Sequence, residues 1–313
     1  MPVAHDGATT RQRRGPSRRT ILLAGAAGGV GAAAAATVAA LSDSPSTPGY
    51  ALRRSASSPV PAVLAGPGVT RVERVYSHAR GRHVNLVLVL PVHAPPQGMP
   101  MSLLLHGLGG SARSAPADGL ESRLSAQVTS LEVPPFGFIA VDGGDNYWHE
   151  HQRGDDPMAM LLDEVPAWLL ERGLGGQDGT PFAATGTSMG GFGAFVYARR
   201  QRERGIELNA IAAISPAFMT SWTEAHRRKA FRNETDWTSL DPLRHLQATR
   251  GIPTAVWCGD QDRFITGVRE FIQLTRPEVG YTGPGRHNGA FFRSTVPGLV
   301  AFLGKHAPGA TSS

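Results

Sequence analysis

The chain is poor in cysteine, with a single one, Cys258, in 313 residues. A lone cysteine cannot form an internal disulfide, which excludes a disulfide-stapled scaffold. It also excludes zinc or iron–sulfur sites built on cysteine ligands. With 41% hydrophobic residues, the chain must therefore fold around an apolar core.

A large excess of one charge sign is also missing from most of the chain. Lys and Arg number 31 against 25 Asp and Glu, but residues 1–40 hold five arginines and one acid. The remaining residues carry 26 basic and 24 acidic side chains. Because nucleic-acid binding relies on a clustered basic excess, we expect no nucleic-acid partner.

Residues 1–40 resemble a Tat signal peptide. Arg18 and Arg19 stand in a basic segment, and the apolar run 21–40 that follows is mostly Ala and Gly. This pattern predicts export of the folded protein through the Tat translocon, cleavage near Ala40, and a secreted or cell-wall-associated product without a stable membrane partner. A retained transmembrane anchor is the alternative, since about 20 residues can span a bilayer.

Beyond the signal, composition and periodicity predict a linker and one globular domain. Residues 41–68 are rich in Ser, Pro, Ala and Gly and read as a disordered linker, followed by a domain over 69–306 and a tail over 307–313. Apolar runs predict strands over 69–76, 83–90, 101–105, 138–141, 182–185, 210–214 and 254–258. Helical spacing predicts helices after Pro157 and over 190–204, 265–275 and 295–303, with Pro166 opposing a straight helix. This alternation predicts an α/β fold with a mostly parallel sheet, helices on both faces and an N-terminal antiparallel hairpin.

The strongest chemical motif is Gly186-Thr187-Ser188-Met189-Gly190, placed where a strand turns into a helix. This is the context of a nucleophile elbow. Ser188 must adopt a strained backbone there, and glycines at 186 and 190 remove side chains that would collide with neighbouring elements. We therefore predict Ser188 as a nucleophile.

A serine hydroxyl needs a base, and the base needs an acid to orient it. In the fold that carries such an elbow, the order along the chain is Ser, acid, His. Asp260 and Asp262 follow the strand that ends at Cys258, and His287 precedes the last helix. The usual position of the acid in the turn beyond the strand favours Asp262, so we predict a triad of Ser188, Asp262 and His287.

Two backbone amides are the candidates for an oxyanion hole. The sequence His106-Gly107-Leu108-Gly109-Gly110 follows the third strand, from which this fold supplies one donor. We predict the N–H groups of Leu108 and Met189 as the two donors, and a structural role for His106.

These motifs carry a family resemblance. His106-Gly107, GTSMGGFGA over 186–194, CGDQD over 258–262 and GRHNGAFF over 285–292 resemble the esterase family of α/β-hydrolases. That family includes S-formylglutathione hydrolases (esterase D), feruloyl-type esterases and the antigen 85 mycolyltransferases. The resemblance implies the α/β-hydrolase fold, and the same nucleophile, acid and base.

The segment 142–151 follows a strand at the predicted catalytic edge and contains two aromatic residues and two histidines. We predict that Tyr147 and Trp148 form an apolar wall for the substrate; the alternative is a solvated loop whose tryptophan packs locally. His149 and His151 lack the spacing of a strong metal motif, so no metal site is predicted. The stretch 215–246 is a candidate cover for part of the cleft.

The sequence thus predicts an exported serine hydrolase that cleaves carboxylic esters of small-molecule, lipid or sugar type and needs no cofactor. Two alternatives remain open. The acyl group could pass to a sugar or lipid hydroxyl, as in mycolyltransferases, or an inactive cell-wall binding protein could have retained the fold.

Overall fold

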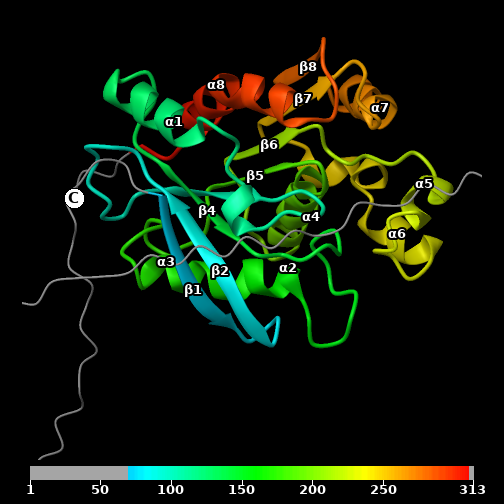
Figure 1. Cartoon of the computed structure of the whole chain (residues 1–313), viewed down its shortest axis with the longest axis horizontal. Coiled ribbons are helices and arrows are strands. Elements are labelled where there is room, and N and C mark those ends of the chain that lie inside the picture. The colour runs from blue at the N-terminus through cyan, green and yellow to red at the C-terminus, as the bar shows by residue number, and fades with distance from the viewer. Residues whose placement is uncertain (1–69, 310–313) are drawn as a thin grey trace, which may run out of the picture. The chain divides into compact units, whose positions relative to one another are not determined.

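The structure, a computed structural model, describes residues 70–309 (Figure 1). The predicted signal peptide 1–40 and linker 41–68 lie outside the described residues, as do residues 310–313 of the tail. Between residues 70 and 309, no helix combines the length and the hydropathy needed to cross a membrane.

Eight strands form one sheet in the order β1-β2-β4-β3-β5-β6-β7-β8. The hairpin β1–β2 is antiparallel and β2 pairs antiparallel with β4, whereas the other neighbours run parallel. The predicted fold class is confirmed. The strands are β1 (Thr70–Ser77), β2 (Arg82–Val89), β3 (Met101–Leu105), β4 (Gly137–Val141), β5 (Ala183–Thr187), β6 (Ala210–Ile214), β7 (Thr254–Gly259) and β8 (Val279–Gly283).

Helices cover both faces of this sheet, as Figure 1 shows. Helices α1 (Leu120–Thr129) and α8 (Gly289–His306) pack on one face, and α4 (Met189–Glu203) and α7 (Ile265–Thr275) pack on the other. In β2, Leu86 and Leu88 belong to one apolar cluster while Val87 and Val89 belong to the other. Alternation along a strand buried on both faces accounts for the two cores.

Pro166 distorts its helix as predicted. The chain runs through α2 (Pro157–Ala159), a π-helical turn at Met160–Glu164 and α3 (Val165–Leu170). Proline has no N–H to donate, and its ring crowds the carbonyl one turn earlier. The wider π turn directly before Pro166 relieves that crowding.

Some strands and α-helices were not predicted from the sequence. They are α1, β8, and the short helices α5 (Trp222–His226) and α6 (Glu234–Leu240). The last helix also begins earlier than expected, at Gly289, because the Asn288 side chain accepts a hydrogen bond from the N–H of Phe291 and caps it.

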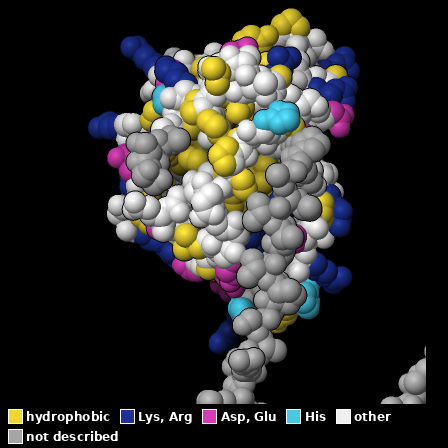
Figure 2. All heavy atoms as spheres, turned by 90° about the vertical axis from the view of Figure 1, so that its left-hand side faces the viewer, with side chains coloured by type: hydrophobic (Ala, Val, Ile, Leu, Met, Phe, Trp, Pro, Cys, Tyr) yellow, Lys and Arg dark blue, Asp and Glu magenta, His cyan; other side chains and the backbone are white. Residues whose placement is uncertain are grey.

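Figure 2 shows the face that lies on the left in Figure 1. Hydrophobic side chains gather in its middle, and both basic and acidic side chains lie around its margin. This mixture agrees with the near balance of charge outside residues 1–40.

Candidate active site

The turn from β5 into α4 places Ser188 at the carboxyl edge of the sheet. Ser188 has φ 59° and ψ −116°, a conformation that L-residues rarely adopt. A methyl group at Gly186 would collide with the backbone of Gly190, and one at Gly190 would collide with the carbonyl of Leu105. The two glycines therefore permit the sharp turn that presents the serine side chain, for the steric reason expected from the sequence.

A chain of hydrogen bonds links the three predicted side chains. His287 Nε2 lies 2.9 Å from Ser188 Oγ, and His287 Nδ1 lies 2.8 Å from Asp262 Oδ2. Asp262 follows β7, and His287 stands between β8 and α8. With Nδ1–H donating to the carboxylate, Nε2 is left to accept from the serine hydroxyl.

The neighbouring acid, Asp260, points elsewhere. Its carboxylate accepts a hydrogen bond from the N–H of Gly285 at 3.3 Å, and the residue is exposed. The structure therefore places Asp262, and not Asp260, beside His287.

Asp262 is almost fully buried, at 3% exposure. Burial alone raises the pKa of its carboxyl group, but hydrogen bonds from His287 and from the N–H of Phe264 outweigh burial and lower the pKa from its ordinary value. The carboxylate is consequently ionised at neutral pH, next to an imidazole that it orients.

The loop after β3 lies directly against the elbow. A methyl group at Gly107 would come within 3.5 Å of Ser188 Cβ. Gly109 N–H donates to Asp145 Oδ1 at 2.6 Å, and Gly110 N–H donates to the Gly107 carbonyl at 3.0 Å. Within residues 70–309 the intervening N–H of Leu108 has no protein acceptor.

The N–H of Met189, the first residue of α4, likewise has no protein acceptor within the described part of the chain. Leu108 lines the cavity that contains Ser188, and Met189 directly follows Ser188 in the sequence. The predicted donors are therefore close to the serine and available.

His106 links the loop after β3 to the loop after β4. Its Nε2 accepts a hydrogen bond from Gly143 N–H at 2.9 Å, and its Nδ1–H donates to the Gly107 carbonyl at 2.8 Å. Burial lowers the pKa of His106, which keeps the ring neutral. Its contacts are those of a structural residue.

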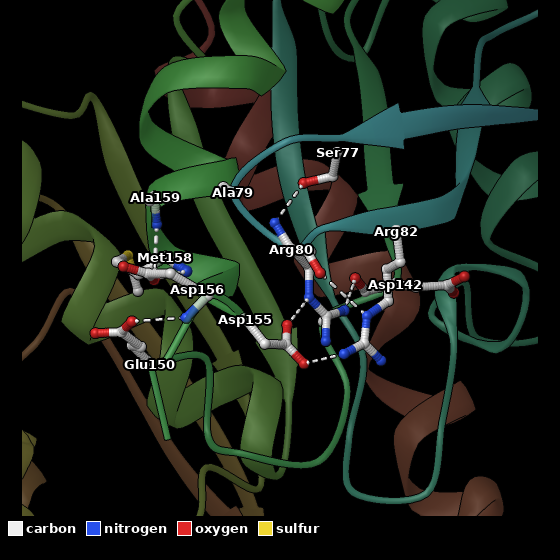
Figure 3. A network of polar contacts seen from close by, with 12 residues as sticks. Ser77, Ala79, Arg80, Arg82, Asp142, Glu150, Asp155, Asp156, Met158 and Ala159 are labelled. Carbon is white, nitrogen blue, oxygen red and sulfur yellow. Dashed lines mark hydrogen bonds and ion pairs between the residues drawn. The ribbon is translucent and has the colours of Figure 1, made fainter. Parts of the chain in front are cut away.

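A buried ionic network holds the loop that follows β4 (Figure 3). Arg80, in the hairpin turn between β1 and β2, donates to Asp155 Oδ1 and to the carbonyl of Asp142, each at 2.6 Å. Arg82 donates to the other oxygen of Asp155, also at 2.6 Å. The Asp142 carboxylate accepts from the N–H of Ala112 at 2.8 Å, so the network connects the hairpin to the loops around the site.

Comparison with known proteins now defines the family. The sequence model of the family described as "Putative esterase" matches residues 77–276, which is more than half of the chain. The chain belongs to this esterase family. The resemblance seen in its motifs is thereby confirmed, and the esterase is a carboxylic ester hydrolase.

Solved structures share the fold of this esterase. A ferulic acid esterase aligns with TM-score 0.64 at 17% identity, covering 77% of this chain and 99% of that one. An S-formylglutathione hydrolase from Staphylococcus aureus gives 0.58 at 17%, covering 76% and 99%. MPT51 from Mycobacterium tuberculosis gives 0.59 at 14%, covering 77% and 100%. No match was found among curated proteins.

The esterase has a cavity of about 370 Å³ above Ser188. Tyr147, one of the two predicted wall residues, borders it, although its side chain is almost fully buried, at 1% exposure. Burial raises the pKa of Tyr147 to about 12, so its hydroxyl keeps its proton at neutral pH.

The prediction that Trp148 forms part of the substrate wall is wrong. Its side chain is fully buried and takes no part in lining the cavity. Tyr147 and Trp148 both have positive φ, at 52° and 62°, and this backbone turns the indole inward against Gly143 and Gly193. Methyl groups at those glycines would collide with the ring, so Trp148 packs in the core of the esterase.

Two arginines in the cavity wall, Arg228 and Arg263, were missed from the sequence. Arg228 belongs to the stretch 215–246, expected to cover part of the cleft, and Arg263 directly follows Asp262. Their positions, one in the predicted cover and one beside the predicted acid, could have identified them as candidates for the cavity wall.

His149, one of the two histidines in the segment 142–151, has a structural role in the esterase. His149 Nε2 lies 2.8 Å from the Ala230 carbonyl, and its ring stacks on Phe231 with centroids 5.4 Å apart. Among residues 70–309, no group of three metal-ligating side chains gathers.

Proposed function

We propose that the protein hydrolyses esters through an acyl-serine intermediate. The observation that carries this proposal is the hydrogen-bonded chain Ser188–His287–Asp262 beside a cavity. A serine hydroxyl is a weak nucleophile at neutral pH unless a neighbouring base accepts its proton as it attacks.

In this mechanism Ser188 Oγ attacks the ester carbonyl while its proton moves to His287 Nε2. The N–H groups of Leu108 and Met189 donate to the developing oxyanion. His287 returns the proton to the leaving alcohol, and Asp262 stabilises the imidazolium. Water, deprotonated by the same histidine, then attacks the acyl-serine and releases the acid.

The test is removal of the nucleophile. Ser188→Ala deletes one hydroxyl at a position that the backbone already determines, so the fold should persist. Labelling by a fluorophosphonate probe should disappear, and turnover of 4-nitrophenyl acetate should fall by about 10⁶-fold if the three residues act as a unit.

Ser130→Ala, at an exposed serine remote from the cavity, is the matched control and should keep both signals. Near-native hydrolysis by a pure Ser188→Ala preparation would contradict the mechanism. Acyl transfer to an added sugar in preference to water would identify a transferase with the same nucleophile.

We further propose that the enzyme acts outside the cytoplasm after export by the Tat translocon, with soluble or cell-wall-associated esters as substrates. The support is in the sequence: the Arg18-Arg19 pair and the apolar run of Ala and Gly that follows it.

A further inference from the structure

The side chains that line the cavity above Ser188 include two arginines and two histidines. Arg228 comes from the turn after α5, and Arg263 from the turn between Asp262 and α7. No Asp or Glu is among the cavity-lining residues of the described chain. A wall of this kind favours a negative charge inside the cavity.

Phe264 holds both guanidinium groups in place. The Cζ atoms of Arg228 and Arg263 lie 5.1 and 5.7 Å from the centroid of its ring, within the range of a cation–π contact. The same buried ring packs edge-on against His287, with centroids 5.3 Å apart. The two positive charges are therefore positioned next to the base of the triad.

These arginines are incompletely neutralised by the protein. The nearest carboxylate oxygen to Arg228, from Glu224, is 3.8 Å away, longer than a hydrogen bond. The buried Nε of Arg228 has no hydrogen-bond partner, and Arg263 forms no ion pair within 4 Å among residues 70–309. The two guanidinium groups therefore keep N–H donors that no carboxylate of the described chain satisfies at hydrogen-bond distance.

Tyr147 completes this part of the cavity. Tyr147 lines the same cavity as Arg228 and Arg263, and burial raises the pKa of its hydroxyl although the charges of the two arginines lower it. Tyr147 stays protonated and can donate one further hydrogen bond.

We propose that the cavity selects esters that carry an anionic group, a carboxylate or a phosphate-type group, bound by Arg228 and Arg263 while the ester carbonyl lies at Ser188. This inference rests on the proposed esterase function. Guanidinium groups pair with such oxyanions through short, charge-assisted hydrogen bonds, whereas a neutral ester offers the two cations no anionic acceptor.

The experiment compares closely matched esters with and without an anionic group. On the acyl side, mono-4-nitrophenyl adipate is paired with its neutral methyl ester and with 4-nitrophenyl 5-phosphonopentanoate, in which a phosphonate replaces the carboxylate. On the alcohol side, 4-acetoxybenzoate is paired with methyl 4-acetoxybenzoate. We expect kcat/KM to be about 10- to 100-fold higher for the favoured anionic ester than for its neutral partner, the range of a charged hydrogen-bonded contact.

Arg228→Gln, Arg263→Gln and the double variant should bring this anionic-to-neutral ratio close to one. Arg269→Gln, an exposed arginine on α7 outside the cavity lining, removes the same charge and should keep the wild-type ratio. Since Arg263 is exposed, its variant remains informative if Arg228→Gln proves unstable in a thermal melt.

Three results would count against these ideas in distinguishable ways. Ser188-dependent hydrolysis with equal kcat/KM for charged and neutral esters would overturn the anion selectivity and leave the esterase function standing. If Arg269→Gln lowered the anionic-to-neutral ratio of kcat/KM as much as the cavity variants do, the selectivity would come from the overall positive potential of the protein and not from a binding site. Absence of both hydrolysis and fluorophosphonate labelling would overturn the esterase function and this inference together.

Discussion

At the scale of single residues, the acid of the triad is the sharpest test. Asp262→Asn keeps the size of the side chain but favours the wrong imidazole tautomer, so we expect turnover to fall by about 10⁴-fold, the size of the effect in a serine protease. Asp260→Asn, at the exposed neighbouring acid, should change turnover far less. Steady-state kinetics on one neutral ester would measure both, and the reverse order would contradict the assignment of the acid while leaving Ser188 and His287 unaffected.

The residues brought together around Ser188 were predictable because each follows a strand at a place that the fold determines. The buried orientation of the Trp148 side chain was not predictable. Its direction depends on two successive residues with positive φ, and no apolar period indicates such a conformation. Arg228 and Arg263 escaped prediction for a related reason, since they lie in irregular turns where spacing does not determine which way a side chain points.

At the scale of elements, we expect Asp241 to make the free energy of unfolding depend on pH. It caps the short 3₁₀ turn Pro242–Arg244 by accepting from the N–H of Leu243 at 3.1 Å, yet it is nearly fully buried. Burial raises the pKa of its carboxyl group to about 6 from an ordinary value of 3.8. Because the folded-state pKa is the higher one, the proton on Asp241 stabilises the fold below about pH 4, and this stabilisation is lost as the pH rises towards 6.

Asp241→Asn cannot ionise and retains a capping oxygen. The free energy of unfolding of this variant, relative to wild type, should therefore increase by up to about 3 kcal/mol between pH 4 and pH 7, two pKa units at 1.4 kcal/mol each. Urea unfolding at pH 4, 5, 6 and 7 measures this difference. A constant difference would mean that Arg244, 3.3 Å away, keeps the carboxylate charged throughout.

The elements that the sequence predicted are those with continuous apolar runs or helical spacing, such as β3, β4 and β7. Strand β8, with the sequence Val-Gly-Tyr-Thr-Gly, has neither. It forms at the edge of the sheet by pairing with β7, so its backbone partner rather than its own side chains determines its conformation. Helices α5 and α6 are too short for a period to emerge and depend on caps from Ser221 and Asn233.

At the scale of the whole molecule, the proposed export route has a direct test. Replacement of both Arg18 and Arg19 by lysine should keep the protein inside the producing cell, because the Tat receptor reads the arginine pair. Activity in the cell fraction and in the medium measures the outcome, with Arg13 and Arg14 replaced by lysine as the control. Continued export of the variant that lacks the Arg18-Arg19 pair would indicate a different route or a membrane anchor.

The spacing of the triad along the chain also has a consequence in time. Ser188 and its partner His287 are 99 residues apart, and the strands that bring them together, β7 and β8, both lie in the last part of the described chain. At a synthesis rate of about 5–20 residues per second, the serine precedes its histidine by roughly 5 to 20 seconds. A growing chain therefore carries the elbow with no base to activate it, and the enzyme becomes competent only when almost the whole domain has been made.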